Sequence, residues 1–90
     1  MYGYPRVPSD MMNKANLVLD TRGTLCPVPI MKTSRAIRQI EVGDVLEVLA
    51  TDPGSKPDIS AWTRMTGNEL LDVAEEGAPR VYRFQIRRLR

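Results

Sequence analysis

The stretch LVLDTRGTLCPVPIMKTSRAIRQIEVGDVLEVLA, residues 17–50, decides the fold of this chain. It begins with the apolar run Leu17–Leu19 and ends with the longer apolar run Val45–Ala50, both of strand length. Between these runs, apolar side chains recur at the spacing of one helical face from residue 28 to residue 40. A strand, a helix and a strand in a stretch of this length predict a parallel crossover unit, which is nearly always right-handed.

A second, shorter helix is expected beyond the loop signal Asp-Pro-Gly-Ser that follows the second strand. Asp58 is expected to cap this helix at its N-terminus, and Gly67 is expected to close it in a left-handed conformation. The helical spacing of Ile59, Trp62 and Met65 predicts that these side chains face the core.

The last part of the chain predicts a hairpin, with residues 70–75 and 81–89 on either side of the turn signal Gly77-Ala78-Pro79. Apolar and polar side chains alternate along the second of these strands, so one of its faces is expected to be buried. The whole order is strand, helix, strand, helix, strand, strand. It predicts an α/β fold, a two-layer α/β sandwich in which two helices cover one face of a four-stranded mixed sheet.

Charge is distributed unevenly along this hairpin. Thirteen basic and eleven acidic residues give a net charge of only +2, which is small for a nucleic-acid-binding module. However, residues 69–76 hold four acidic side chains and no basic ones, and residues 80–90 hold five arginines and no acidic side chain. Opposite charges that face each other across a hairpin stabilise it by ~0.2–1 kcal/mol per pair. We therefore expect these charges to pair, and the alternative is a patch that binds a partner.

Composition excludes several classes of function. With one cysteine and no histidine, the chain has no internal disulfide, no Ser-His-Asp triad and no ordinary zinc site. No apolar run has the length of a membrane span, and the N-terminus lacks the apolar stretch of a secretory signal. Residues 1–15 show no usable periodicity and are expected to be a flexible leader to a single domain at 16–90. We expect a small cytoplasmic protein without metal, cofactor or membrane partner.

The segment at 23–30, Gly-Thr-Leu-Cys-Pro-Val-Pro-Ile, lies where the first strand gives way to the first helix. Proline is tolerated in the first helical turn, because the amide hydrogen that it lacks would have no partner there. Pro27 is therefore expected at the first helical position and Pro29 in the opening turn, which makes Cys26 the N-cap. Gly23 would allow a tight turn just before this position.

A sulfur atom at the N-cap would face free backbone N–H groups and the positive end of the helix dipole. Both effects favour the thiolate, so this position predicts a lowered pKa and a reactive Cys26. The alternative is that Cys26 is a small buried side chain without chemical function.

Five blocks of the sequence resemble the TusA/SirA-like sulfur-carrier family, and the similarity runs from Asn16 to Leu89. The blocks are Leu-Asp-Thr-Arg-Gly at 19–23, Cys-Pro-Val-Pro at 26–29, Gly-Asp-Val-Leu-Glu-Val at 43–48, Thr-Asp-Pro-Gly-Ser at 51–55 and Asp-Ile-Ser-Ala-Trp at 58–62. The resemblance implies the two-layer sandwich and a persulfide carried on Cys26. It also implies a sulfur donor, either a cysteine desulfurase or a rhodanese, and a sulfur-acceptor relay protein. The pathways that it implies are tRNA thiolation, molybdenum-cofactor maturation and dissimilatory sulfur oxidation.

The expected chemistry needs no metal, because a thiolate attacks the outer sulfur of a donor persulfide and a second thiolate later removes that sulfur. With one cysteine in the chain, this second attack must come from another molecule. A persulfide also needs some shelter from oxidation. The apolar side chains Leu25, Val28 and Met31 would supply it, although their default role is packing.

Four further residues are candidates for partner docking. Lys32 and Arg35 recur with Arg38 every three residues on one side of the first helix, and this side is either a solvated face or a surface for an acidic partner. Asp52 either starts the Asp-Pro-Gly turn or lies near the cysteine and helps to position a partner. Many relatives have a basic residue where this chain has Pro57, and Lys56, one position earlier, is the substitute.

Two other functions are compatible with the sequence. The order of elements also resembles the C-terminal domain of translation initiation factor three, in which case Lys32, Arg83 and Arg87 would contact phosphate in RNA. The scarcity of aromatic side chains for stacking argues against direct nucleic-acid binding. A thiol redox sensor is the other alternative, and it would form a sulfenic acid or a mixed disulfide at Cys26.

Overall fold

The computed structural model describes residues 15–90, so the predicted leader lies outside the described residues except for its last position. The described elements, in chain order, are β1 (Leu17–Asp20), α2 (Val28–Ala36), the 3₁₀ helix η1 (Ile37–Gln39), β2 (Val45–Ala50), α3 (Ser55–Thr66), β3 (Glu69–Glu76) and β4 (Val81–Arg87). No helix in this part of the chain is long and apolar enough to cross a membrane.

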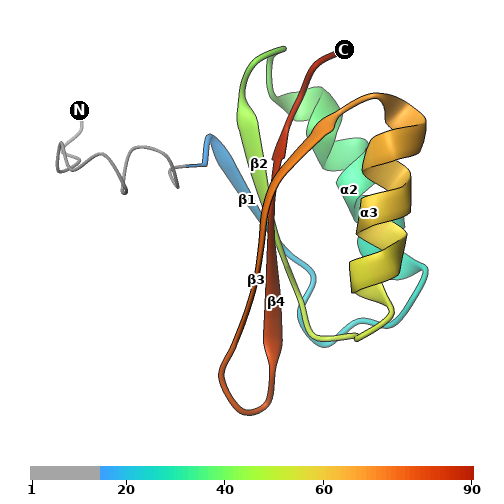
Figure 1. The fold of residues 1–90 in the computed structure, drawn as a ribbon, viewed down its shortest axis with the longest axis vertical. Helices are drawn as coiled ribbons and strands as arrows, with labels where there is room; N and C mark the ends of the chain where they lie inside the picture. The colour runs from blue at the N-terminus through green and yellow to red at the C-terminus, as the bar shows by residue number, and fades with distance from the viewer. Residues whose placement is uncertain (1–14) are drawn as a thin grey trace, which may run out of the picture.

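The four strands form one mixed sheet in the order β1-β2-β4-β3. β1 pairs with β2 in parallel, and β4 is antiparallel to both of its neighbours. Both α-helices lie on the same face of the sheet (Figure 1). The predicted two-layer α/β sandwich, with its order of elements, is confirmed.

The core lies between this face of the sheet and the helices. The central strands β2 and β4 supply Leu46, Val48, Phe84 and Ile86, which are fully buried. Their spacing of two places each of them on the same face, as the alternation in β4 predicts. α3 contributes Ile59, also fully buried. Burial of each such side chain contributes about 1.5–3 kcal/mol to folding, so the middle of the sheet carries much of the stability.

The hairpin of β3 and β4 pairs its opposite charges, as the sequence predicts. Arg87 lies 3.7 Å from Glu69, which is opposite it in the strand register. Arg83 forms an ion pair with Glu76 and also lies 3.9 Å from Glu47 on the neighbouring strand β2. Such exposed pairs are each worth only ~0–1 kcal/mol. Their consequence is that Arg83 and Arg87, the arginines of the RNA-binding alternative, already face carboxylates.

Helix α3 begins earlier than the sequence predicts. Its N-cap is Gly54, and Asp58 lies in the first turn instead of at the cap, so this prediction is wrong. The physical reason is that Asp52 organises the turn: its Oδ1 accepts a hydrogen bond from Gly54 N at 3.2 Å, and its carbonyl accepts one from Ser55 N at 2.9 Å. Gly67 ends the helix with φ +78°, in the left-handed conformation that was expected.

The predicted inward face of α3 is correct for two of its three side chains. Ile59 is fully buried and Trp62 is partly buried against the core, but Met65 is 85% exposed. Six residues along a helix correspond to about 600° of rotation, which places Met65 roughly 120° away from Ile59 around the axis. Thr63, four residues after Ile59, is buried in its stead.

Candidate functional site

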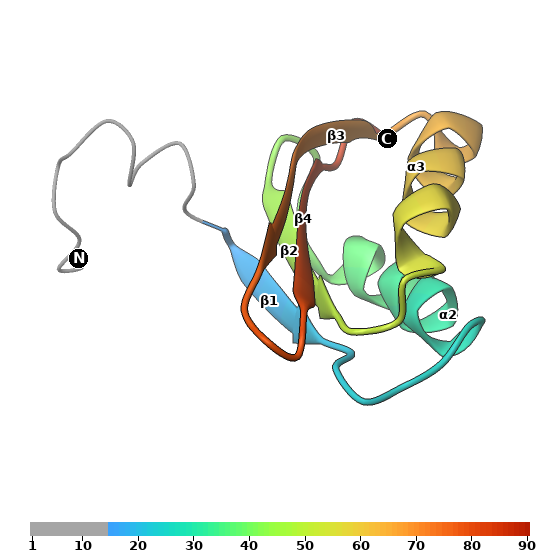
Figure 2. The same cartoon turned by 60° about the horizontal axis from the view of Figure 1, so that its bottom comes forward.

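Cys26 lies in the loop that leads from β1 into α2. The loop from β2 into α3, which contains Asp52, leaves the sheet at the same edge. β1 and β2 are parallel, with Asp20 beside Leu49, so the chain leaves both strands in the same direction. The two loops therefore run side by side beneath the helices (Figure 2).

Hydrogen bonds hold the two loops together. The buried Thr21 donates its hydroxyl proton to the carbonyl of Leu49 at 2.6 Å. Gly23 then turns the chain with φ +82°, in the left-handed region that glycine adopts readily, and donates its N–H to the Thr51 hydroxyl at 2.9 Å. These contacts hold the loop that contains Cys26 at a fixed position relative to the loop that contains Asp52.

Asp52 joins the turn before α3 to the cysteine. While its Oδ1 holds the Gly54 amide, its Oδ2 accepts a hydrogen bond from the backbone N–H of Cys26 at 2.9 Å. The two roles that the sequence suggested, turn former and neighbour of the cysteine, are therefore combined in one carboxylate.

The sulfur atom of Cys26 has a carboxylate partner of its own. Cys26 is exposed, and its thiol donates a hydrogen bond to Asp58 Oδ2 at 3.0 Å. Asp58 lies in the first turn of α3, 32 residues further along the chain. From the sequence, Asp58 is expected only to cap the helix. The signal for its place beside Cys26 is the parallel pair of strands, which brings the two following loops to one edge of the sheet.

These carboxylates raise the pKa of the Cys26 thiol above its ordinary value of 9.0. The largest cause is the hydrogen bond to Asp58, which stabilises the protonated form, and desolvation and the negative charges of Asp58 and Asp52 act in the same direction. The prediction of a lowered pKa is wrong.

The start of α2 explains part of this difference. Pro27, with φ −100° and ψ 17°, occupies the N-cap, and the helix runs from Val28. Pro29 lies in the first turn, as expected, but Pro27 is not helical and Cys26 lies one residue outside the cap. The first helical hydrogen bond runs from Met31 N to Pro27 O at 3.1 Å. Cys26 is therefore not the N-cap. Its thiol donates a hydrogen bond to a carboxylate and does not face the free N–H groups of a helix start.

The side chains next to the cysteine are more exposed than predicted. Leu25 and Met31 are 72% and 51% exposed, so they do not pack into the core. Val28 is half-buried. Exposed apolar side chains beside a reactive group are typical of a surface that contacts another protein.

The basic residues near the site do not surround the sulfur. Arg22 donates hydrogen bonds to both carboxylate oxygens of Asp20, at 2.9 and 2.8 Å, and this arginine lowers the pKa of Asp20 to about 2. Lys56 forms an ion pair with Glu75 on β3. Lys32 and Arg35 are exposed on α2, where they line a cavity of about 210 Å³ beside β1.

Comparison with known proteins places this site in a family. The family model described as sulfurtransferase TusA matches residues 17–88. The putative sulfur carrier protein YrkI of Bacillus subtilis is 45% identical over 64 residues, which cover 71% of this chain and 85% of that protein. The sulfur carrier protein TusA of Allochromatium vinosum is 46% identical over 59 residues, which cover 66% of this chain and 78% of that protein.

A longer relative and a solved structure complete the comparison. The putative sulfur carrier protein YrkF of Bacillus subtilis is 47% identical over 66 residues, which are 73% of this chain but only 36% of that protein. The crystal structure of a SirA-like protein from Desulfitobacterium hafniense has a TM-score of 0.67 at 20% identity, and the match covers 78% of this chain and 95% of that one. This structure shows the same fold. With the family model matching nearly all of the described residues, the chain belongs to the TusA family of sulfur carriers.

Proposed function

We propose that this protein carries sulfane sulfur as a persulfide on Cys26. It takes the sulfur from a donor protein, either a cysteine desulfurase or a rhodanese, and gives it to an acceptor relay protein. The observation that carries the proposal is an exposed thiol held by Asp52 and Asp58 in a member of a sulfur-carrier family. The protein is a sulfurtransferase in the sense of a carrier, since its single cysteine needs a second molecule for every step.

Loading exchanges one sulfur–sulfur bond for another. The Cys26 sulfur attacks the outer sulfur of the donor persulfide, a new bond forms between the two, and the bond inside the donor persulfide breaks. The electron pair of that bond stays on the inner sulfur of the donor, which leaves as a thiolate. The proton of Cys26 passes to Asp58 Oδ2, 3.0 Å away, and from there to the departing thiolate.

Unloading repeats the exchange with the acceptor. The acceptor thiol gives its proton to Asp58 as its sulfur attacks the outer sulfur on Cys26. The bond inside the Cys26 persulfide breaks, and its electron pair stays on the Cys26 sulfur. A thiolate with a raised pKa leaves slowly, so the proton that Asp58 took from the acceptor passes to the Cys26 sulfur and assists this step. The same carboxylate thus serves both directions of the transfer.

Docking of the partner proteins is assigned to the surface around Cys26. Leu25 and Met31 supply exposed apolar contacts, and Lys32 and Arg35 supply positive charge for an acidic partner. Asp52 helps to position the partner because it fixes the backbone of Cys26. Lys56 contributes less, since Glu75 already neutralises it.

Mass spectrometry tests the proposal directly. Incubation with a cysteine desulfurase and cysteine should add about 32 Da, one sulfur atom, to the peptide that contains Cys26. Dithiothreitol should remove this mass, and the Cys26→Ser variant should not acquire it. Labile sulfur on the serine variant, or no gain on the wild type with any persulfide donor, would refute the proposal.

The pathway is a further part of the proposal. The family points to tRNA thiolation, molybdenum-cofactor maturation or dissimilatory sulfur oxidation, all in the cytoplasm, where thiols are kept reduced. These pathways differ in their final product. Protein loaded with isotopically labelled sulfur and added to cell extract should deliver the label to tRNA, to the cofactor or to oxidised sulfur, and the labelled product identifies the pathway.

A further inference from the structure

Arginines without an aspartate or glutamate partner gather at the end of the helices opposite Cys26. On the hairpin, Arg80, Arg83 and Arg87 each lie within ion-pair distance of a glutamate. Arg38, in η1, differs from them: within residues 15–90 its side chain has neither a hydrogen bond nor an ion pair. Arg88, just after β4, donates only to backbone oxygens, those of Ile40 and Arg90.

These two arginines line the same cavity, of about 220 Å³, between the ends of the two helices and the C-terminal segment. Its other lining residues are Ser34, Ile37, Trp62, Thr66, Asn68 and Arg90. No aspartate or glutamate side chain is among them. The cavity is therefore lined by three arginines, Arg38, Arg88 and Arg90, and several neutral hydrogen-bonding groups, with no acidic side chain that would neutralise the arginines.

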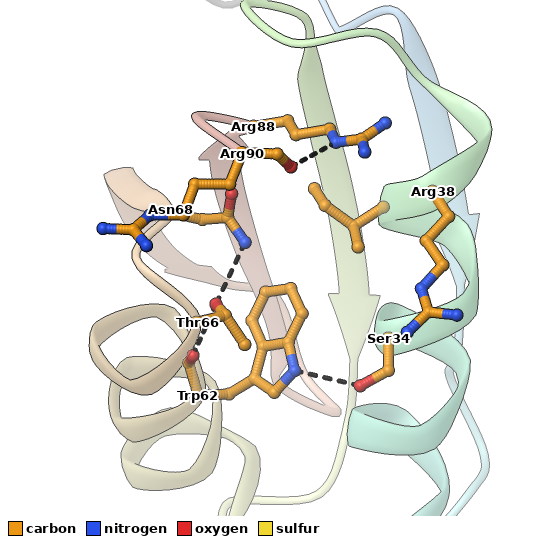
Figure 3. A pocket seen from close by; sticks show the side chains of 8 residues that line it. Ser34, Arg38, Trp62, Thr66, Asn68, Arg88 and Arg90 are labelled. Carbon is orange, nitrogen blue, oxygen red and sulfur yellow. Dashed lines mark hydrogen bonds between the residues drawn. The ribbon is translucent and has the colours of Figure 1, made fainter.

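The indole of Trp62 forms one wall of this cavity (Figure 3). Its Nε1 donates to Ser34 Oγ at 2.9 Å, which joins α3 to α2 and fixes the plane of the ring. The Arg38 guanidinium lies next to Ser34, while that of Arg90 points away from the indole (Figure 3). Arg38 is thus the cation that is free to bind a ligand, and Trp62 is the rigid aromatic surface beside it.

We propose that this cavity binds a phosphate group, either free or as the monoester of a small molecule. A guanidinium presents its N–H groups in a planar fork that matches two oxygens of a phosphate. Arg88 is preorganised for this task because its contacts with two backbone oxygens hold it in place and leave other N–H groups unused. The volume is below the roughly 300–1,000 Å³ of drug-sized sites, so the ligand is small.

The site is separate from the sulfur chemistry. Cys26 precedes α2 and Arg38 follows it, and this helix of nine residues is about 13 Å long. Phosphate binding should therefore be the same in the Cys26→Ser variant as in the wild type. If no phosphate binds, the sulfur-carrier proposal still stands, and if Cys26 carries no sulfur, the phosphate-site proposal still stands.

Fluorescence of Trp62 tests the proposal, because it is the only tryptophan in the chain. Titration with inorganic phosphate, and separately with adenosine monophosphate, should give a saturable change that sodium chloride at matched ionic strength does not produce. A response to both probes identifies the phosphate group as the ligand. A response to the nucleotide alone identifies the monoester, with the indole contacting its organic part.

The Arg38→Gln variant should bind about tenfold more weakly or worse, the loss expected for one charge-assisted contact. Arg64→Gln is the matched control, because it removes the same charge from α3 at a position outside the cavity. Circular dichroism checks that both variants fold, and amide shifts of Ser34 and Asn68 in the wild type report binding without any mutation. Equal affinity in the two variants, or no response to either probe, would overturn the proposal.

Discussion

The thiol of Cys26 donates a hydrogen bond to Asp58 across 3.0 Å, so the sulfur atom that we propose as the persulfide carrier lies against a negative charge. Reactive cysteines are commonly activated by a neighbouring cation or a helix start, both of which favour the thiolate. Here the neighbour favours the thiol, and the pKa is raised. Oxidation follows thiolate character, so the arrangement protects the exposed Cys26 thiol and argues against a role as a redox sensor.

Replacing Asp58 with asparagine should lower the pKa of Cys26. The substitution removes both the charge and the strongest acceptor of the thiol proton, so more thiolate is present at neutral pH. We expect iodoacetamide to alkylate Asp58→Asn several-fold faster than the wild type at pH 7, with similar rates at a pH where both thiols are ionised. The matched control is Asp52→Asn, which should have a smaller effect because its oxygen bonds the backbone of Cys26 and not the sulfur. An unchanged pH profile in Asp58→Asn would contradict the assignment.

Stability at alkaline pH should also report this contact. A pKa that is raised in the folded state means that the folded protein holds the thiol proton more tightly than the unfolded chain. This contribution is complete below the unfolded value, near 9.0, and is lost as the pH rises through the higher folded value. Urea unfolding should therefore show the wild type losing stability relative to Cys26→Ser above about pH 9, with a constant difference at lower pH. A constant difference across the whole range would show that Asp58 does not bind the thiol.

The ion pair of Asp20 with Arg22 should make stability depend on pH in the acid range. Its pKa is lowered to about 2 by the hydrogen bonds from Arg22, so its contribution to stability is present above the ordinary value of 3.8 and is lost as the pH falls through 2. Asp20→Asn should therefore be less stable than the wild type at pH 5, and the difference should disappear near pH 2. The effect is small because the pair is exposed. Thermal unfolding at a series of pH values measures it.

Asp52→Ala should loosen the cysteine loop with little change in the core. The substitution removes the acceptors of the Gly54 and Cys26 amides, and loss of a hydrogen bond to a charged group costs ~1.5–3 kcal/mol. We expect faster hydrogen exchange at the Cys26 amide and slower loading from a protein donor, with loading from a small persulfide largely kept. Asp72→Ala, an exposed carboxylate on β3, is the control and should change neither measurement. Unchanged exchange at Cys26 would count against this role of Asp52.

Truncation of a core side chain should lower the free energy of unfolding far more than truncation of an exposed one. Phe84 is fully buried in the central strand β4, and its replacement by alanine should cost about 3–5 kcal/mol in the free energy of unfolding. Met65→Ala, on the exposed side of α3, should stay within about 0.5 kcal/mol of the wild type. Chemical denaturation measures both. A small effect at Phe84 would show that the sheet and helices pack less tightly than described.

Local patterns in the sequence were enough to predict the layers of this fold. The alternation along β4 and the apolar run of β2 are properties of neighbouring residues, and they predict two of the strands and the buried face of β4. The ends of the helices were less predictable. The start of α3 moved to Ser55 because the Asp52 side chain organises the turn before it, and Met65 turned outward because its spacing from Ile59 does not match the helical period.

The order of the elements, the pairing of charges in the hairpin and the family motif around one cysteine could be predicted from the amino-acid sequence, because each depends on residues close together in the chain. The protonation of that cysteine could not, because it depends on how distant parts of the chain pack together. Cys26 and Asp58 are 32 residues apart in the chain. They are in contact because β1 and β2 are parallel, so the loops that follow these strands begin at the same edge of the sheet. A pKa depends on charges within a few ångströms, whichever part of the chain supplies them.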